Sequence, residues 1–107
     1  MQIDYIEFSS PDLQATKALF AQAFGWNFND YGPEYQELAD AGLAGGVAAA
    51  PLAPPVVILK SDNLEQALAQ VQAAGGTITL PIFDFPGGRR FQFREPGGTE
   101  MAIWSEA

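Results

Sequence analysis

The sequence predicts an α+β fold built from two tandem βαβββ modules. A shift of 51 residues places the chain on itself, so that Ser10 falls on Ser61, Leu13 on Leu64 and Gly25 on Gly76. Each half begins with a strand-like apolar run, continues into a helix-like segment and returns in extended segments. A supersecondary unit that is repeated in this way usually cannot bury its apolar face alone and needs its copy.

The first half predicts one strand, one helix and three more strands. Residues 2–8 alternate and are rich in aromatic and β-branched types, which indicates a strand. Ser10 is the expected N-cap of the helix, with Pro11 at the first helical position and Gly25 at its end. Three further strands are expected at 26–30, 34–39 and 45–49.

The second half repeats this plan after a joint. Asp62 and Glu65 resemble a capping box at the start of the second helix, and Gly75-Gly76 closes it. Four strands are expected at 56–60, 77–82, 89–94 and 100–104. Residues 50–55 contain three prolines, so neither a helix nor a central strand is expected there. The chain is therefore expected to be one domain, 1–107, with module one at 1–50, module two at 55–107 and a proline-rich joint at 50–55.

Composition limits the class of protein. A chain of 107 residues can bury one core but is short for two independent domains, and a hydrophobic fraction of 48% excludes a disordered chain. There is no apolar run long enough for a membrane span, no signal-peptide pattern and no cysteine. We therefore expect a cytoplasmic protein. The net charge of −8 opposes binding to phosphate backbones and anionic lipids, so neither nucleic acid nor membrane is expected as a partner.

The order of several short motifs resembles a known superfamily. The motifs are Ile6-Glu7-Phe8 before Asp12-Leu13, the helix exit Phe24-Gly25-Trp26, Gly45-Gly46, Ala73-Ala74-Gly75-Gly76, and the turn Phe93-Arg94-Glu95-Pro96-Gly97-Gly98-Thr99. Together they resemble the vicinal oxygen chelate superfamily of glyoxalases, bleomycin-resistance proteins and extradiol dioxygenases, and above all its short glyoxalase-related branch. The resemblance implies that the modules form an open, curved eight-stranded mixed sheet around a cleft, with the helices on the outer face.

The metal ligands of that superfamily have no good counterparts in this chain. The resemblance carries three of the four ligand positions onto Tyr5, Val56 and Ala102, and the fourth onto the stretch 43–50, which holds only Leu, Ala, Gly and Val. Valine, alanine and glycine side chains cannot bind a divalent cation, and the chain has no histidine. We expect no metal site and no cofactor. Losing the Lewis acid also argues against a metal-dependent dioxygenase.

Strand alternation indicates which side chains line the implied cleft. If the former ligand positions face inward, so do the residues two positions away. On strand 89–94, Phe91 and Phe93 are expected to meet the helix, which turns Gln92 and Arg94 toward the cleft. The expected ligand-binding residues are Tyr5, Glu7, Ile58, Lys60, Gln92, Arg94, Glu100 and Trp104.

Glu7 is the candidate catalytic residue. A carboxylate in a half-apolar cleft can act as a general base, with Arg94 orienting an anionic substrate. The alternative is that Glu7 makes a structural ion pair with Arg94 or Lys60. In the same way, the arginines at 89, 90 and 94 could simply pair with surplus acids, and Tyr5 and Trp104 could be packing residues.

Two function classes follow from the sequence. The first is a glyoxalase- or bleomycin-resistance-like protein that binds a small organic molecule in the cleft without a metal. The alternative is a lyase or isomerase that uses Glu7 as general base, so the sequence leaves open whether the protein is an enzyme. The expected partners are a small-molecule ligand and a second copy in a homodimer, because open half-sheets leave strand edges and apolar surface uncovered.

Overall fold

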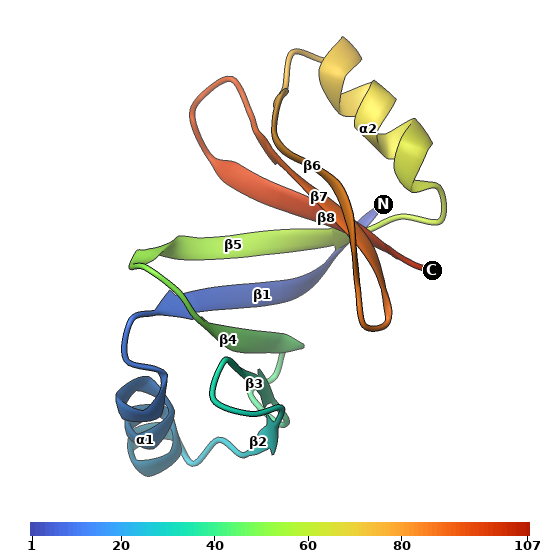
Figure 1. The fold of residues 1–107 in the computed structure, drawn as a ribbon. Coiled ribbons are helices and arrows are strands. Elements are labelled where there is room, and N and C mark those ends of the chain that lie inside the picture. Colours follow the sequence, from blue (N-terminus) through green and yellow to red (C-terminus); the bar gives the residue numbers. More distant parts are fainter. The chain divides into compact units, whose positions relative to one another are not determined.

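The computed structural model describes all residues from 1 to 107 and confirms the α+β fold (Figure 1). The order β-α-β-β-β occurs twice, as the 51-residue repeat predicts. The first set is β1 (Gln2–Ser10), α1 (Leu13–Phe24), β2 (Phe28–Asp30), β3 (Tyr35–Leu38) and β4 (Gly45–Ala49). The second set is β5 (Ala53–Lys60), α2 (Leu64–Ala73), β6 (Thr77–Phe85), β7 (Gly88–Arg94) and β8 (Glu100–Glu106).

The chain divides into two compact units. One consists of Tyr5–Val56, and the other of Val57–Ala107 together with Met1–Asp4. The first four residues therefore belong with the second half of the chain. The cleft that the resemblance implies between the two modules stays a prediction.

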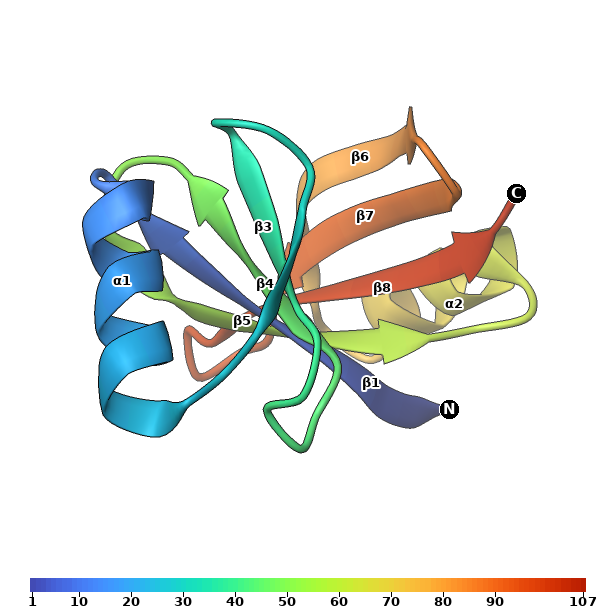
Figure 2. The same cartoon turned by 90° about the horizontal axis from the view of Figure 1, so that it is seen from below.

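In the first unit, α1 packs on one face of a four-stranded sheet (Figure 2). The strand order is β2-β3-β4-β1, and the pairs are antiparallel except for β1 with β4. The register pairs Phe8 with Val47, and the Phe8 ring meets Phe20 of α1 edge-on, with 5.5 Å between ring centroids. Val47 is fully buried, and Leu13 of α1 is only 5% exposed. Phe8 of β1 therefore faces the helix, and the alternation of the strand turns its neighbour Glu7 to the opposite face.

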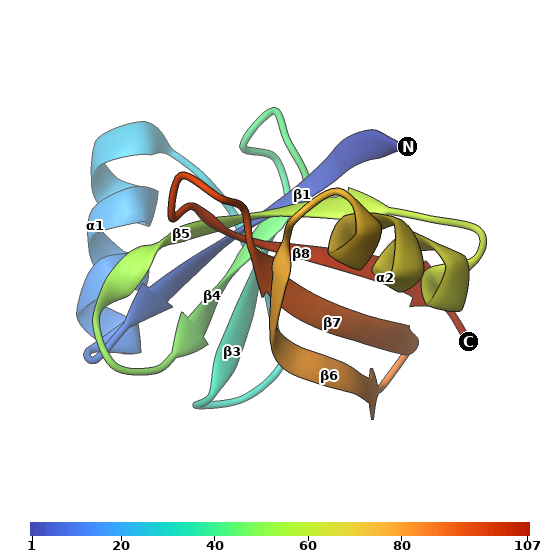
Figure 3. The same cartoon turned by 90° about the horizontal axis from the view of Figure 1, so that it is seen from above.

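In the second unit, α2 covers one face of the sheet β6-β7-β8-β5 (Figure 3). Only the β5–β8 pair is parallel. Phe91 and Phe93 of β7 pack with Leu64, Ala67 and Ile103 in the main hydrophobic core, and all five are buried. This confirms that the two phenylalanines meet the helix and that Gln92 and Arg94 lie on the opposite face.

The predicted N-caps of both helices were wrong by one or two residues. Asp12, not Ser10, caps α1, because its Oδ1 accepts a hydrogen bond from the Ala15 amide at 3.1 Å. Ser10 instead accepts a hydrogen bond from the Asp12 amide, at 3.0 Å. A helix begins where a side chain satisfies its first free amides, and Asp12 is the residue that does so.

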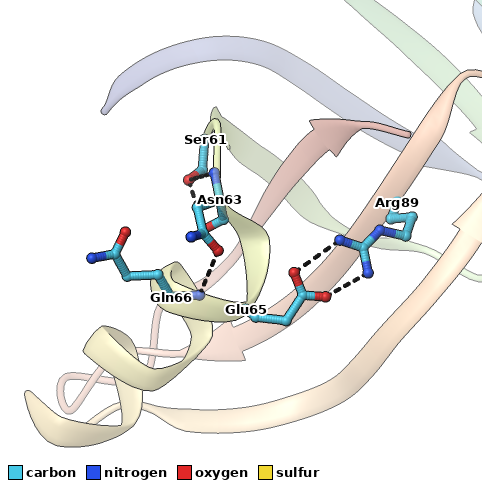
Figure 4. A network of polar contacts seen from close by, with 5 residues as sticks. All are labelled: Ser61, Asn63, Glu65, Gln66 and Arg89. Atoms are coloured by element: carbon cyan, nitrogen blue, oxygen red, sulfur yellow. Dashed lines mark hydrogen bonds and ion pairs between the residues drawn. The ribbon is translucent and has the colours of Figure 1, made fainter.

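The second helix repeats this arrangement 51 residues later (Figure 4). Asn63, not Asp62, is the cap, and its Oδ1 accepts from the Gln66 amide at 3.0 Å. Ser61 Oγ accepts from the Asn63 amide at 3.1 Å, as Ser10 does from Asp12. The repeat thus extends to individual capping hydrogen bonds.

The proline-rich joint is shorter than predicted. Strand β5 begins at Ala53 and contains Pro54 and Pro55, which were expected to lie outside any central strand. Both prolines are exposed, and the ladder with β8 starts only at Val57. Their missing amides therefore remove no hydrogen bond from that ladder. No helix in the structure combines the length and the apolar character that crossing a membrane would require.

Candidate functional site

In the first unit, the candidate site lies on the face of the sheet that points away from α1. The register pairs Glu7 with Gly46, Gly46 with Glu37, and Tyr35 with Ala48. Tyr5 shares the face of Glu7, because residues two apart on a strand point the same way. Three neighbouring strands thus bring Tyr5, Glu7 and Tyr35 together.

These three side chains form a chain of hydrogen bonds. The hydroxyl oxygens of Tyr5 and Tyr35 are 2.5 Å apart, and Tyr35 Oη donates to Glu7 Oε2 at 3.2 Å. Tyr35 has a single hydroxyl proton, so while that proton is given to the carboxylate, Tyr5 must be the donor between the two tyrosines. The chain then runs from Tyr5 through Tyr35 to Glu7.

Tyr35 is held in its neutral form. Burial, followed by its hydrogen bond with Tyr5 and the nearby charge of Glu7, raises the pKa of the Tyr35 phenol far above its ordinary value of 10.0. A phenolate there would be poorly solvated and would repel the carboxylate. At any ordinary pH Tyr35 keeps its proton and can both accept and donate a hydrogen bond.

Gly46 makes room for the tyrosine pair. A Cβ atom at this buried position would lie 2.5 Å from Tyr5 Oη and 2.5 Å from Tyr35 Cζ, and closer still to Tyr35 Oη. Atoms this close cannot coexist without displacing a neighbour. A glycine on β4 is therefore what allows the two hydroxyl groups to meet.

An open hollow of about 520 Å³ adjoins this chain of hydrogen bonds. Tyr5 lines it together with Glu37 and the segment 38–45 between β3 and β4. Two carboxylates of the hollow have amide partners, because Glu37 accepts from Asn29 Nδ2 and Asp40 accepts from Asn27 Nδ2, both at 2.9 Å. The hollow thus combines a phenol, carboxylates and backbone groups, a composition suited to a polar organic molecule.

In the second unit, the face away from α2 carries a separate polar network. Gln92 Nε2 donates to Glu100 Oε1 at 3.4 Å, and Arg90 Nη2 donates to Gln92 Oε1 at 2.8 Å. Thr79 also donates to Glu100, at 2.5 Å. The Arg94 guanidinium lies 3.7 Å from Glu100 Oε2 in a loose ion pair and its side chain is 55% exposed.

Trp104 and Lys60 form a second group on that face. Lys60 Nζ lies 4.9 Å from the centre of the Trp104 ring and 3.6 Å from Glu106 Oε1. The indole of Trp104 donates to Asp4 Oδ2 at 2.9 Å. Ile58 is buried and pairs with Ala102 beside them. Trp104 is therefore fixed by a hydrogen bond and by a cation over its ring.

The predicted ligand-binding residues thus fall into groups on the two units. Tyr5 and Glu7 share the first, while Gln92, Arg94 and Glu100 form one group of the second, and Ile58, Lys60 and Trp104 the other. Lys60 forms an ion pair with Glu106, and Arg94 forms one with Glu100.

The arginine cluster also splits. Arg89 makes a bidentate pair with Glu65 of α2, at 2.6 and 2.9 Å (Figure 4). By strand alternation it shares the helix-facing side of β7 with Phe91 and Phe93, opposite to Gln92 and Arg94. This contact, mainly through its hydrogen bonds, lowers the pKa of Glu65 to about 2. Pairing of arginines with surplus acids, the alternative that the sequence left open, is found for Arg89 and for Arg94.

Tyr35 was missed by the sequence analysis. It lies on β3, 30 residues from Tyr5, and only the registers of β1, β3 and β4 bring it to Glu7. Strand alternation within 34–39 places Tyr35 and Glu37 on one face, and this was the available signal.

The chain belongs to the Glyoxalase/Bleomycin resistance protein/Dioxygenase superfamily, whose family model matches residues 2–103. It is similar to the protein CFP32 of Mycobacterium bovis, a provisionally named glyoxylase, with 23% identity over 94% of this chain. This chain spans 44% of the length of that relative.

Solved structures share the fold. A superfamily member from Vibrio splendidus has a TM-score of 0.77 at 15% identity, with 98% of each chain covered. A Mn(II)-bound glyoxalase from Novosphingobium aromaticivorans has a TM-score of 0.72 at 22% identity, over 97% of this chain and 38% of its own.

The residues present do not fit the metal ion that the superfamily implies. The 51-residue shift carries Glu7 onto Ile58, whose partner is Ala102, so Gly46 holds in the first unit the position that Ala102 holds in the second. The four positions are thus Tyr5, Gly46, Val56 and Ala102, which offer one phenol oxygen among them. No group of three or more Asp, Glu, His or Cys side chains is arranged to hold a metal. Such a donor set does not suit a divalent ion.

Proposed function

We propose that this protein binds a small organic molecule through side chains alone, without a metal ion. The observation that carries the proposal is the hydrogen-bonded chain of Tyr5, Tyr35 and Glu7 beside Gly46. Tyr5 and Gly46 stand at two of the positions where the superfamily places metal ligands. Phenol and carboxylate groups beside a hollow can orient a polar ligand directly.

On the second unit, Arg94 is proposed as an anchor for an anionic small molecule. Its guanidinium is more than half exposed, and its pair with Glu100 is loose at 3.7 Å. An arginine held in this way can exchange its partner for a ligand carboxylate, which offers bidentate geometry. Trp104, fixed by Asp4, supplies a flat apolar surface on the same face of the second unit.

A thermal-shift screen with small carboxylic acids, phenols and amines tests the proposal. We expect ligands that raise the melting temperature of the wild type and that lose most of this effect in Tyr35→Phe. Tyr31→Phe is the matched control, because Tyr31 is 64% exposed and lies outside the chain of hydrogen bonds. Ligands that stabilise the Tyr35→Phe and Tyr31→Phe proteins equally would contradict a role for the site.

For an anionic ligand, Arg94→Ala is expected to weaken binding by about 1.5–3 kcal/mol, the range for a hydrogen bond to a charged group. Arg89→Ala serves as the control, because Arg89 is committed to Glu65. Equal small effects of the two substitutions would mean that Arg94 does not contact the ligand.

A second candidate function is a lyase or isomerase in which Glu7 is the general base. The specific support is the hydroxyl of Tyr35 beside Glu7 Oε2, which places a proton donor next to the carboxylate. In that case Glu7→Gln abolishes turnover of a ligand found in the screen but leaves its affinity nearly unchanged. Retained turnover in Glu7→Gln would exclude this role.

A further inference from the structure

We propose that Tyr35 connects Glu7 to Tyr5 as a proton relay, so that the charge on Glu7 is transmitted to the Tyr5 hydroxyl. The proposal deepens the second candidate function and rests on it for the reaction that the relay would serve. It makes Tyr35 a positioning residue, which acts on a ligand only through Tyr5 and Glu7.

The geometry supplies both contacts of a relay. Tyr35 Oη lies 2.5 Å from Tyr5 Oη and 3.2 Å from Glu7 Oε2. Tyr35 therefore has a hydrogen bond to each of the other two groups. Because the phenol of Tyr35 stays protonated, Tyr35 can give its proton to one neighbour only while it receives a proton from the other.

The two end states differ in the direction of every hydrogen bond. With Glu7 ionised, Tyr5 donates to Tyr35 and Tyr35 donates to Glu7. With Glu7 protonated, the carboxylic acid can donate to Tyr35, Tyr35 to Tyr5, and the Tyr5 proton then points out of the chain. Such linked bonds polarise one another, so a change at one end is felt at the other.

Taken as a reaction, the step balances without a further reagent. A ligand O–H bond breaks as its proton joins Tyr5 Oη, the former Tyr5 proton moves to Tyr35, and the Tyr35 proton moves to the Glu7 carboxylate. Three O–H bonds break and three form, and the negative charge moves from Glu7 to the ligand oxygen. The relay therefore suits a ligand with a hydroxyl or enol proton, and Tyr5 lies at the edge of the hollow that would receive it.

Nuclear magnetic resonance of the phenol carbons tests the connection without any ligand. The chain has three tyrosines, so protein labelled with ¹³C at the tyrosine Cζ gives three signals, from Tyr5, Tyr31 and Tyr35. The signals are compared at one fixed pH in four proteins: the wild type, Glu7→Gln, Tyr35→Phe and the double variant. Amide spectra confirm that each protein is folded, and Tyr31 is the internal control.

The relay predicts that Glu7→Gln moves the Tyr5 signal when Tyr35 is present. In the Tyr35→Phe background the same substitution should move the Tyr5 signal at least about threefold less, because the linking hydroxyl is gone. Tyr31 should not move. An equal movement of Tyr5 in both backgrounds would show that Glu7 acts on Tyr5 directly and would overturn the proposal, as would no movement at all.

A second comparison needs no Tyr35 variant. In Glu7→Gln the Tyr35 signal must move further than the Tyr5 signal, because Tyr35 is one hydrogen bond closer to the change. A larger movement of Tyr5 would also overturn the relay. Because no ligand is used, this result is independent of the thermal-shift screen, so a failure of binding and a failure of the relay are told apart.

Discussion

Replacing Gly46 by alanine should destabilise the protein through the tyrosine pair. The new Cβ would collide with Tyr5 Oη and with the Tyr35 phenol, which are the far ends of side chains and can swing away. The movement breaks the Tyr5–Tyr35 and Tyr35–Glu7 hydrogen bonds, worth about 1 kcal/mol each. The change from glycine to alanine also restricts the unfolded chain, which offsets about 0.4–1 kcal/mol of this loss in stability. The net loss should be about 1–1.5 kcal/mol.

The neighbouring glycine provides a matched comparison. At Gly45 a Cβ would lie 2.6 Å from the backbone oxygen of Ile6, so β1 and β4 would have to separate rather than a side chain rotate. Gly45→Ala should therefore cost about 3 kcal/mol, at the upper end of the range for overpacking. Urea unfolding measures both losses, and an unchanged m-value shows that the comparison is valid.

A double variant identifies the cause. In Tyr35→Leu both hydrogen bonds are already lost and the phenol is gone, so adding Gly46→Ala should cost little or even stabilise the protein. A coupling energy of about 1 kcal/mol or more is expected between the two positions. If Gly46→Ala costs the same with and without Tyr35, or costs more than Gly45→Ala, the steric argument is wrong.

Three other predictions test the remaining features. Asn63→Ala should lose about 1 kcal/mol of unfolding free energy in thermal or urea unfolding, because the α2 cap is lost, whereas Asp62→Ala should lose well under half of that; the reverse order would restore Asp62 as the cap. The pKa of Glu65 is lowered from 4.5 to about 2, so the stability from its pair with Arg89 is full above pH about 4.5 and disappears as the pH falls toward about 2. The difference in unfolding free energy between the wild type and Glu65→Gln should therefore shrink over that pH interval, and a constant difference would contradict the prediction. Elemental analysis of protein purified without a histidine tag should find no stoichiometric transition metal, and one ion per chain, removed by chelation with loss of ligand binding, would refute the donor-set argument.

The sequence predicted those features that depend on local pattern. Phe91 and Phe93 were assigned to the helix-facing core because alternation and burial are periodic along a strand. The caps were misplaced because Ser10-Pro11-Asp12 and Ser61-Asp62-Asn63 each offer more than one good capping side chain, and residue type alone does not decide which one reaches an amide.

Features that depend on long-range register were not predictable. Tyr35 meets Tyr5 only because β3 and β1 both pair with β4 in one particular register, and a slip of one residue would turn Tyr35 to the other face. The bidentate pair of Arg89 with Glu65 likewise joins β7 to α2 over 24 residues. The local sequence pattern therefore predicts where strands form, whereas these long-range contacts depend on how the strands pair in the assembled sheet.

The hydrogen bond between Trp104 and Asp4 has a consequence for how the protein is made. It joins residues 100 positions apart, and Met1–Asp4 belong to the same compact unit as Val57–Ala107. During synthesis Asp4 leaves the ribosome 100 residues before Trp104, its partner on β8. The segment Tyr5–Val56 can gather its contacts while translation continues, whereas the second unit must wait to recover its N-terminal piece. Closing so long a loop is slow compared with local pairing, so docking of Asp4 should be a late event in folding.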